Sequence, residues 1–325
     1  MAGYEGGDDL AALIGAPERT RARFSFELYP PRSPAAEVAL EHALAELVAS
    51  GPDFISVTYG ANGSTRGVSL NVLKHLLENT GVSPMAHFTA VGTTFAETSR
   101  LIREFLDAGV TSFLALRGDP PAGVSEDELV LGDFGSASEL VQLIHAVQSE
   151  REPFLAHDVP GFPGAKRLGS GRKVTIAVAA FPNGHPRSRS REQDLDTLLA
   201  KEAAGANLAI TQLFFEADDY LGFVDDARAA GVTMPILPGI MPVLSEQRLH
   251  RILELTGEAT PTRLLDELRG AADPASVGIA HATRLARDVL AGGAPGIHLY
   301  TFNRSEAPLA VLGELGLLSP KEIPA

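Results

Sequence analysis

Eight short runs rich in apolar and β-branched residues recur along the 325-residue chain, and each is followed by a longer stretch with helical spacing. Alternation of strand-like runs with helix-like stretches is typical of βαβ units on a parallel sheet. The runs are RFSFEL from 23, DFISVTY from 53, PMAHFTAV from 84, TSFLALR from 111, KVTIAVAAF from 173, NLAITQLFF from 207, MPILPGI from 234 and GIHLYTF from 296. Eight such pairs predict a closed barrel.

The predicted fold class is α/β, a (β/α)8 TIM barrel in a single domain. Chains of about 250 residues or more commonly form one such barrel. An open doubly wound sheet would usually have fewer strands and a Gly-rich turn after the first strand. Here FELYPPRSP follows the first strand, without a G-x-G-x-x-G sequence. The helices are expected within 35–50, 95–109, 138–149, 194–206 and 218–231, among other segments.

Two segments do not fit the alternation of predicted strands and helices. Residues 1–22 read as an N-terminal tail or capping segment, and 23–325 as the barrel catalytic domain. A Pro/Gly-rich insertion at about 151–171 is long for a loop in a compact domain, which leaves a lid, a partner surface or disorder as interpretations.

Composition excludes several classes of function. The net charge is −14 with only 27 Lys and Arg, so no broad basic face is expected for nucleic acid. The chain has no cysteine, which excludes disulfides, thiolate nucleophiles and Cys-based metal sites. No segment reaches the roughly 18 apolar residues of a membrane span, so no membrane partner is expected and a cytoplasmic location is the default.

The first strand carries the strongest candidate for catalysis. Alternation directs Phe24, Phe26 and Leu28 toward the helices, and Ser25 and Glu27 into the barrel. Barrels of this class hold their active sites at the carboxyl ends of the strands. Burial there raises the pKa of a carboxyl toward that of a useful general acid, so we expect Glu27 to be such an acid. A salt-bridged structural glutamate is the alternative.

Other polar residues close the remaining strands at the same rim. No metal is expected, because the histidines lack ligand spacing, and no Gly-x-Ser-x-Gly elbow is present. The set suits binding and protonation of a polar, planar, partly anionic ligand. It comprises Thr58, Tyr59, His87, Arg117, Gly118, Asp119, Phe181, His185, Thr211, Gln212, Tyr300, Asn303 and Arg304.

Seven ordered motifs resemble the methylenetetrahydrofolate reductase family, in its bacterial form with the catalytic domain only. They are FSFELYPPR (24–32), FISVTYGANGSTR (54–66), LALRGDPP (114–121), AAFPNGHP (179–186), GANLAITQLFF (205–215), PILPGIMPV (235–243) and YTFNRSE (300–306). The resemblance implies a flavoprotein of one-carbon metabolism that reduces 5,10-methylenetetrahydrofolate to 5-methyltetrahydrofolate. Electrons would come from NADH or NADPH by ping-pong transfer through FAD.

The resemblance also implies roles for individual residues. Glu27 falls on the general acid that protonates N10 of the folate, and Asp119 on a carboxylate that contacts the pterin and tunes the flavin. Gln212 and Arg304 fall on further folate-contacting positions. The positions that hold FAD correspond to Thr58, His87, Arg117, Gly118, Asp119, Ala137, Phe181, His185, Asp194 and Lys201. The oligomeric state stays open, a homo-oligomer included.

The chain departs from the family pattern at five positions. Phe181 replaces a common Tyr, Thr197 and Ala200 stand where Asn and Arg often assist FAD, Arg248 where a Gln contacts folate, and Ile252 where an aromatic stacks. The alternative hypothesis is therefore a flavin-independent reductase that transfers hydride directly from NAD(P)H to the same substrate. A barrel aldolase or isomerase acting on a phosphorylated substrate is more remote, because PGIMPV and NRSEAP form no Gly-rich phosphate cup. A non-enzymatic binding module is also disfavoured, because ligand binding alone does not explain why Glu27, Asp119 and Gln212 are expected on one rim.

Overall fold

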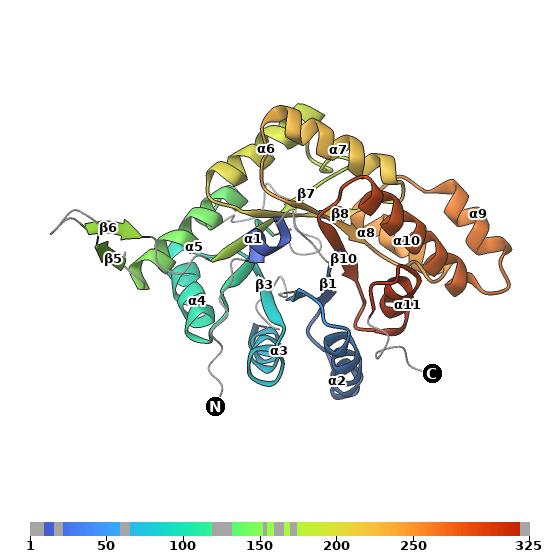
Figure 1. Ribbon diagram of the computed structural model, residues 1–325, viewed down its shortest axis with the longest axis horizontal. Helices are drawn as coiled ribbons and strands as arrows, with labels where there is room; N and C mark the ends of the chain where they lie inside the picture. Colours follow the sequence, from blue (N-terminus) through green and yellow to red (C-terminus); the bar gives the residue numbers. More distant parts are fainter. Residues whose placement is uncertain are drawn as a thin grey trace.

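The structure, a computed structural model, describes residues 10–15, 22–58, 66–118, 132–151, 155–158, 166–169 and 174–318. Eight parallel strands close into a barrel (Figure 1), so the predicted TIM barrel is confirmed. The strands are β1 (Arg23–Leu28), β2 (Phe54–Val57), β3 (Ser83–Thr89), β4 (Ser112–Leu116), β7 (Thr175–Ala180), β8 (Leu208–Leu213), β9 (Ile236–Ile240) and β10 (Gly296–Tyr300). Each coincides with one of the eight predicted runs.

Consecutive barrel strands are neighbours, and β10 pairs with β1 to close the ring. The pairing places Glu27 opposite Tyr300 on one side and opposite Ser56 on the other. Because all eight strands are parallel, their carboxyl ends meet at one end of the barrel, where polar residues from distant parts of the chain come together.

Helices surround the barrel between the strands (Figure 1). Local signals set several of their ends: α4 begins with a capping box between Thr94 and Glu97, and α7 ends at Gly231, whose φ of 104° is in the left-handed region. These helices are α2 (Pro34–Ala49), α3 (Arg66–Asn79), α4 (Phe95–Asp107), α5 (Ala137–Arg151), α6 (Arg191–Ala203), α7 (Ala217–Ala230), α10 (Pro274–Ala291) and α11 (Glu306–Glu314).

Two further helices, α8 (Glu246–Thr256) and α9 (Thr262–Gly270), follow β9 before the chain reaches α10. Their apolar residues Leu249, Ile252 and Leu268 pack in a separate small core that also holds Leu213 and Phe215 from the end of β8. This pair of helices therefore covers part of the rim beside β8. Its packing on Leu213 and Phe215 holds α8 next to the mouth of the barrel.

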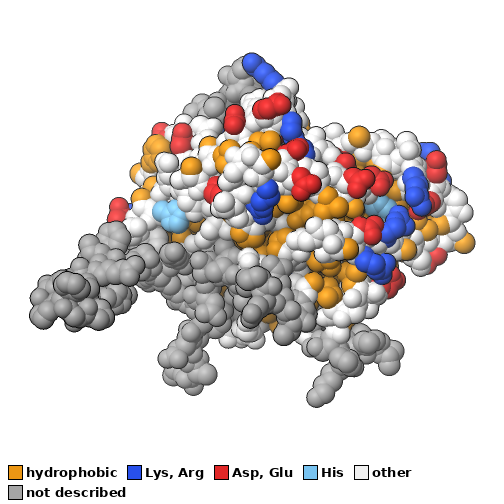
Figure 2. All heavy atoms as spheres, turned by 45° about the horizontal axis from the view of Figure 1, so that its top comes forward, with side chains coloured by type: hydrophobic (Ala, Val, Ile, Leu, Met, Phe, Trp, Pro, Cys, Tyr) orange, Lys and Arg blue, Asp and Glu red, His pale blue; other side chains and the backbone are white. Residues whose placement is uncertain are grey.

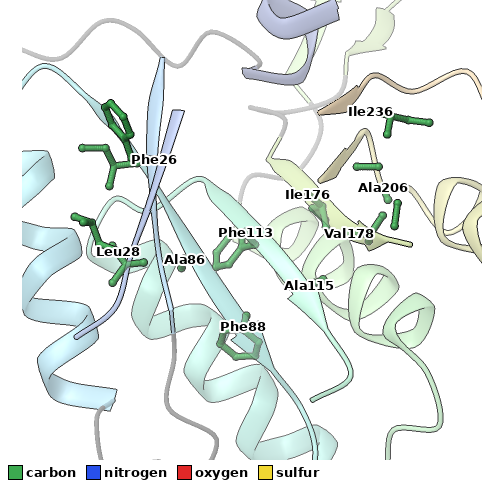
Figure 3. Packing of buried hydrophobic residues seen from close by; sticks show 14 of the residues in the cluster. Phe26, Leu28, Ala86, Phe88, Phe113, Ala115, Ile176, Val178, Ala206 and Ile236 are labelled. Atoms are coloured by element: carbon green, nitrogen blue, oxygen red, sulfur yellow. The ribbon is translucent and has the colours of Figure 1, made fainter. Parts of the chain in front are cut away.

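The main core lies between the barrel and its helices. Phe24, Phe26 and Leu28 of β1 are buried in it, as the alternation predicts, together with outward residues of the other strands such as Phe88 and Phe113 (Figure 3). The opposite parity of β1 points into the barrel, so Ser25 and Glu27 lie inside the ring of strands.

The short helix α1 (Leu10–Gly15) lies within the ring of strands in Figure 1. Leu10 and Ile14 are 4% and 1% exposed and pack against inward residues from the first halves of the strands, including Phe54 and Leu208. This helix fills the amino-terminal end of the barrel, opposite the polar rim.

Part of the segment predicted as an insertion forms an antiparallel pair of strands, β5 (Leu155–Asp158) and β6 (Lys166–Gly169), which projects outward from the barrel (Figure 1). On the face shown in Figure 2, Lys and Arg side chains lie among Asp and Glu rather than in one basic stripe. Within the described residues, no helix is both long and apolar enough to cross a membrane.

Candidate active site

The candidate residues divide between two arcs of neighbouring strands at the carboxyl end of the barrel. Positions matched to FAD follow or lie on β2, β3, β4 and β7, which we call the β2–β7 arc. The candidate acid Glu27 and the folate positions Gln212 and Arg304 lie on or after β1, β8 and β10, which with β9 form the β8–β1 arc. Residues spread over the whole sequence thus fall into two continuous halves of one rim.

Glu27 lies inside the mouth of the barrel, and its side chain is 22% exposed. Its Oε2 atom is 3.5 Å from Nε2 of His87 on β3 and 4.0 Å from Nε2 of His298 on β10. No Lys or Arg ion pair to Glu27 occurs in the described part of the chain. The carboxyl lies beside two imidazoles, each of which forms an ion pair with it only when protonated.

Buried polar groups deeper in the barrel hold the two imidazoles that face the carboxyl. His298 is completely buried, and its Nδ1 lies 2.8 Å from Oγ of Ser25. Oγ of Ser56 lies 3.1 Å from Nε2 of His87 and 3.5 Å from Nε2 of His298. The two imidazoles are thus fixed by serine hydroxyls from β1 and β2, which orients both toward Glu27.

His298 and Ser56 are two site residues that the sequence pattern alone did not indicate. Both have the inward parity of their strands, since His298 is two residues before Tyr300 and Ser56 is opposite Glu27 in the β1–β2 register. The alternation of inward and outward side chains along β2 and β10 was the signal that could have identified them, once the inward face of β1 was known.

The electrostatics of Glu27 correct one sequence-based expectation. Burial acts to raise the pKa of the Glu27 carboxyl, but His87 and His298 together outweigh burial, so the pKa lies below its ordinary value. The expectation of a raised pKa is therefore wrong: the pKa of Glu27 is lowered. Burial also lowers the pKa of His87, against the opposing effect of Glu27.

Tyr300 and Thr211 close the β8–β1 arc next to Glu27. The Tyr300 hydroxyl donates to the Thr211 carbonyl at 2.9 Å, and the Thr211 hydroxyl accepts from the Gly239 N–H at 2.9 Å. Burial, with a further contribution from Glu27, raises the pKa of Tyr300. Tyr300 is therefore a neutral, fixed hydroxyl at neutral pH.

On the β2–β7 arc, Thr58, Arg117 and Gly118 are half-buried at the ends of β2 and β4. Gly118 has a φ of 92°, and a Cβ there would lie 2.7 Å from Cγ1 of Val91, so the turn after β4 requires glycine. Ala137 is the first residue of α5 and is buried.

The loop between β7 and α6 holds Phe181 and His185, and α6 itself holds Asp194 and Lys201. The Phe181 and His185 rings meet edge to face at 4.6 Å, and the His185 N–H donates to Oδ2 of Asp194 at 3.2 Å. Lys201 is buried and donates to the Ala179 carbonyl at 2.8 Å; burial lowers its pKa to about 8, against the opposing effect of Asp194. A pocket of about 580 Å³ opens beside this loop, facing Glu258.

The folate-matched positions differ in how far the structure describes them. Oε1 of Gln212 accepts from the Leu213 N–H at 2.9 Å, where the β8–β9 register shifts. Arg304 is exposed after β10. Asp119 and Tyr59 lie outside the described residues. Among those that are described, no cluster of three His, Cys, Asp or Glu could hold a metal ion.

Comparison with known proteins identifies relatives over nearly the whole chain. A family model described as methylenetetrahydrofolate reductase matches residues 13–316. The chain is 32% identical over 297 residues to the 5,10-methylenetetrahydrofolate reductase of Escherichia coli, with 90% of each chain covered. It is 32% identical over 331 residues to methylenetetrahydrofolate reductase (NADH) 1 of Zea mays, covering 97% of this chain and 51% of that protein.

The chain therefore spans about half the length of the plant relatives that it matches. Among solved structures, it is similar to an uncharacterized protein from Clostridium thermocellum that binds two copies of 5-methyl-5,6,7,8-tetrahydrofolic acid. The TM-score is 0.59 at 12% identity, with 90% of this chain and 93% of that chain covered. At this identity the likeness concerns the fold alone.

Proposed function

The chain belongs to the methylenetetrahydrofolate reductase family, and on that premise we propose that it reduces 5,10-methylenetetrahydrofolate to 5-methyltetrahydrofolate with electrons from NADH or NADPH. One observation carries the proposal: Glu27, which matches the family's general acid, lies at the mouth of the barrel between two fixed imidazoles. A carboxyl in that position can exchange a proton with a ligand that covers the mouth.

We further propose that FAD binds along the β2–β7 arc. When bound, FAD supplies a two-electron carrier that accepts hydride from the nicotinamide and passes it to the folate. The residues fit this group, because the arc offers hydroxyl, guanidinium and imidazole groups from Thr58, Arg117 and His185, and the glycine turn at Gly118 has no side chain in the way. Lys201 donates to the Ala179 carbonyl, so it ties α6, the helix that also carries Asp194, to the end of β7.

Glu27 must gain a proton before it can donate one to N10. The pKa of Glu27 lies below its ordinary value, so the carboxyl is ionised at neutral pH. A planar ligand over the mouth would exclude water from the 22% of the side chain that is exposed, and the loss of solvation raises the pKa of a carboxyl. Protonation would then accompany ligand binding at a carboxyl that lies 3.5 Å from His87 and 4.0 Å from His298. Gln212, Arg304 and Asp119 are proposed to contact the folate.

The first experiment is a visible absorption spectrum of the protein purified without added cofactor, followed by anaerobic addition of NADH or NADPH. We expect a flavin spectrum that a nicotinamide bleaches and methylenetetrahydrofolate restores. A colourless protein that oxidises NAD(P)H only with the folate present would establish the flavin-independent route instead. Absence of folate-dependent oxidation, even with FAD supplied, would contradict the proposed function.

The second experiment replaces Glu27 by Gln, which keeps the shape of the side chain and removes its proton chemistry. We expect folate turnover to fall by about 10²- to 10⁴-fold, the usual contribution of general acid catalysis. Folate binding and reduction by the nicotinamide should stay within a few-fold of wild type. Glu37→Gln, at an exposed position of α2, is the matched control. Equal turnover in both variants would exclude Glu27 as the acid.

A further inference from the structure

The carboxyl end of β8 departs from regular sheet pairing where it carries Gln212. The register of β8 against β9 shifts between Ile210 and Leu213, which indicates a β-bulge. Bulges are common beside ligand sites, where they redirect a side chain, and they interrupt the ladder of hydrogen bonds between the strands. The position of Gln212 therefore depends on contacts from outside the sheet as well as within it.

The side chain of Gln212 is held at one end only. Its Oε1 accepts from the Leu213 N–H at 2.9 Å, and its NH2 group has no hydrogen-bond partner in the described part of the chain. An amide NH2 group offers two donors, so this half-buried side chain can donate to a ligand at the rim. Any shift of the backbone at the end of β8 would move these donors relative to Glu27.

Helix α10 reaches the segment after the bulge through His281. This side chain is 7% exposed, and its Nε2 lies 3.1 Å from the carbonyl oxygen of Phe215, which follows Gln212 closely in the chain. The His281 and Phe215 rings also lie near each other, with centroids 6.5 Å apart. A carbonyl oxygen only accepts, so the imidazole N–H donates to it. One donor of α10 thus holds the backbone that follows Gln212.

The same face of α10 reaches the loop after β9 through Gly278, one turn before His281. A Cβ on Gly278 would lie 1.8 Å from the Val243 oxygen and 2.5 Å from the Val243 carbonyl carbon. Val243 belongs to the connection between β9 and α8. The helix backbone therefore lies directly against the backbone of this loop, an approach that only glycine permits.

Helix α10 is a suitable common support for both loops because it is itself well held. It packs against α7, α9 and α11 as well as against β9 and β10. Leu213, Phe215 and Val243 share one small core, against which Val277 of α10 packs. The loops after β8 and β9 are thus fixed to one helix.

We propose that His281 and Gly278 are positioning residues: they hold the loops after β8 and β9 so that Gln212 meets the folate while its reacting end lies over Glu27. Neither residue touches the ligand, since both are buried behind these loops. This inference rests on the proposed function. A misplacement of about 1 Å by a change far from the reaction can cost about 10²-fold in rate. Loss of either contact should therefore weaken folate binding without removing any group that binds it.

The first test removes the His281 hydrogen bond. His281→Leu keeps most of the volume and loses the donor, whereas His281→Gln keeps a donor. The matched control is His145→Leu, because Nε2 of His145 lies 2.9 Å from the Gly205 carbonyl oxygen in the connection between α6 and β8. That connection is at the amino end of the barrel, so the control loses the same kind of bond on the far side from Gln212.

The second test fills the contact at Gly278. Gly278→Ala forces the helix and the loop that carries Val243 apart. Its control is Gly296→Ala, where a Cβ would lie 2.5 Å from the Arg23 carbonyl oxygen at the start of β10. Both variants overpack a methyl group against a backbone carbonyl, but only the first does so at the polar rim. If Gly278→Ala does not fold, the histidine variants still decide the question.

The variants are compared by the dissociation constant of 5-methyltetrahydrofolate from calorimetry, by KM and kcat for methylenetetrahydrofolate, by bound flavin and by the free energy of unfolding. We expect His281→Leu and Gly278→Ala to weaken folate binding and raise KM by about 10-fold, with kcat within about threefold of wild type. His281→Gln should recover the affinity to within about threefold. Bound flavin should not change, because FAD is proposed to lie along the β2–β7 arc. Both control variants should lose stability and keep wild-type folate affinity.

Folate affinity within about twofold of wild type in both His281→Leu and Gly278→Ala would refute the inference, as would equal losses in the test and control variants. Failure of His281→Gln to recover the affinity would also contradict it, because the donor would then not be what positions Gln212. In each of these cases wild type still binds and reduces the folate. A wild type that does neither refutes the proposed function itself, and the positioning role falls with it.

Discussion

At the residue scale, Gly239 of β9 shows how closely the barrel is packed around Tyr300. A Cβ on Gly239 would lie 2.4 Å from the Thr211 carbonyl oxygen and 2.8 Å from the Tyr300 hydroxyl. Those two atoms hydrogen-bond to each other at 2.9 Å, and the Gly239 N–H donates to the Thr211 hydroxyl. The small residue lets β8, β9 and β10 meet through this set of bonds next to Glu27.

We expect Gly239→Ala to lower the free energy of unfolding by about 1 to 3 kcal/mol, because the new methyl group overpacks against a backbone carbonyl that cannot move cheaply. Gly222→Ala is the control: its Cβ would meet nothing within 4 Å, and it lies in α7, where Ala is favoured over Gly by about 1 kcal/mol. Thermal or urea unfolding measures both. A Gly239→Ala variant as stable as wild type would mean that Tyr300 and Thr211 can move apart to accommodate the methyl group at little cost in free energy.

The sequence predicted individual site residues unevenly. Glu27 and Ser25 were found because alternation within one strand gives their direction without knowledge of other strands. His298 and Ser56 were missed, since what makes them part of the site is the register of β1 against β10 and β2. The sign of the Glu27 pKa shift was wrong for the same reason: burial follows from one strand, whereas the two imidazoles come from two others.

At the element scale, α10 is tied to the end of β8 by His281. The side chain is buried, and its Nε2 lies 3.1 Å from the Phe215 carbonyl oxygen. A carbonyl only accepts, so Nε2 carries the proton and the ring is held in one neutral tautomer. Burial lowers the pKa of His281 to about 4, with Arg284 acting in the same direction.

The lowered pKa makes this contact sensitive to acid. The unfolded chain binds a proton at His281 near pH 6.5 and the folded chain only near pH 4, so stability falls as the pH falls through this window. We expect wild type to lose about 2 kcal/mol of unfolding free energy between pH 7.5 and 5, relative to His281→Gln, which donates without titrating. Urea unfolding at the two pH values measures it. The exposed His42→Gln on α2 should behave as wild type does; parallel pH profiles of all three proteins would contradict the expectation.

Elements were predicted better than residues where their patterns were periodic. The eight strands appear where expected, and the helices expected at 35–50 and 218–231 appear as α2 and α7. The pair α8 and α9 was not foreseen as a unit, because its apolar face packs on Leu213 and Phe215 instead of on the barrel wall, a partner that local periodicity does not reveal.

At the scale of the whole molecule, the barrel separates two tasks at its two ends. The carboxyl end gathers Glu27, His87 and His298 within a polar rim. The amino end is filled by apolar residues around α1, among them Ile14 and Met85. Inward residues thus change along β2 from Phe54 to Ser56, and along β3 from Met85 to His87, from a packed apolar layer to a polar layer.

This separation predicts that damage to the amino end lowers stability and leaves catalysis intact. Ile14 is 1% exposed, so Ile14→Ala should lower the free energy of unfolding by about 2 to 4 kcal/mol through the lost contacts and the cavity left behind. Leu255→Ala, at a 67% exposed position of α8, should change it by less than about 0.5 kcal/mol.

Both variants should keep wild-type KM values for the folate and the nicotinamide, because neither side chain reaches the polar rim. Urea unfolding and steady-state kinetics on the same preparations test the two parts together. Unchanged stability in Ile14→Ala would mean that α1 leaves the barrel at little cost in solution. A raised KM in that variant would mean that packing of the lower layer is transmitted along the strands to Glu27, and the two ends would then have to be treated as one coupled unit.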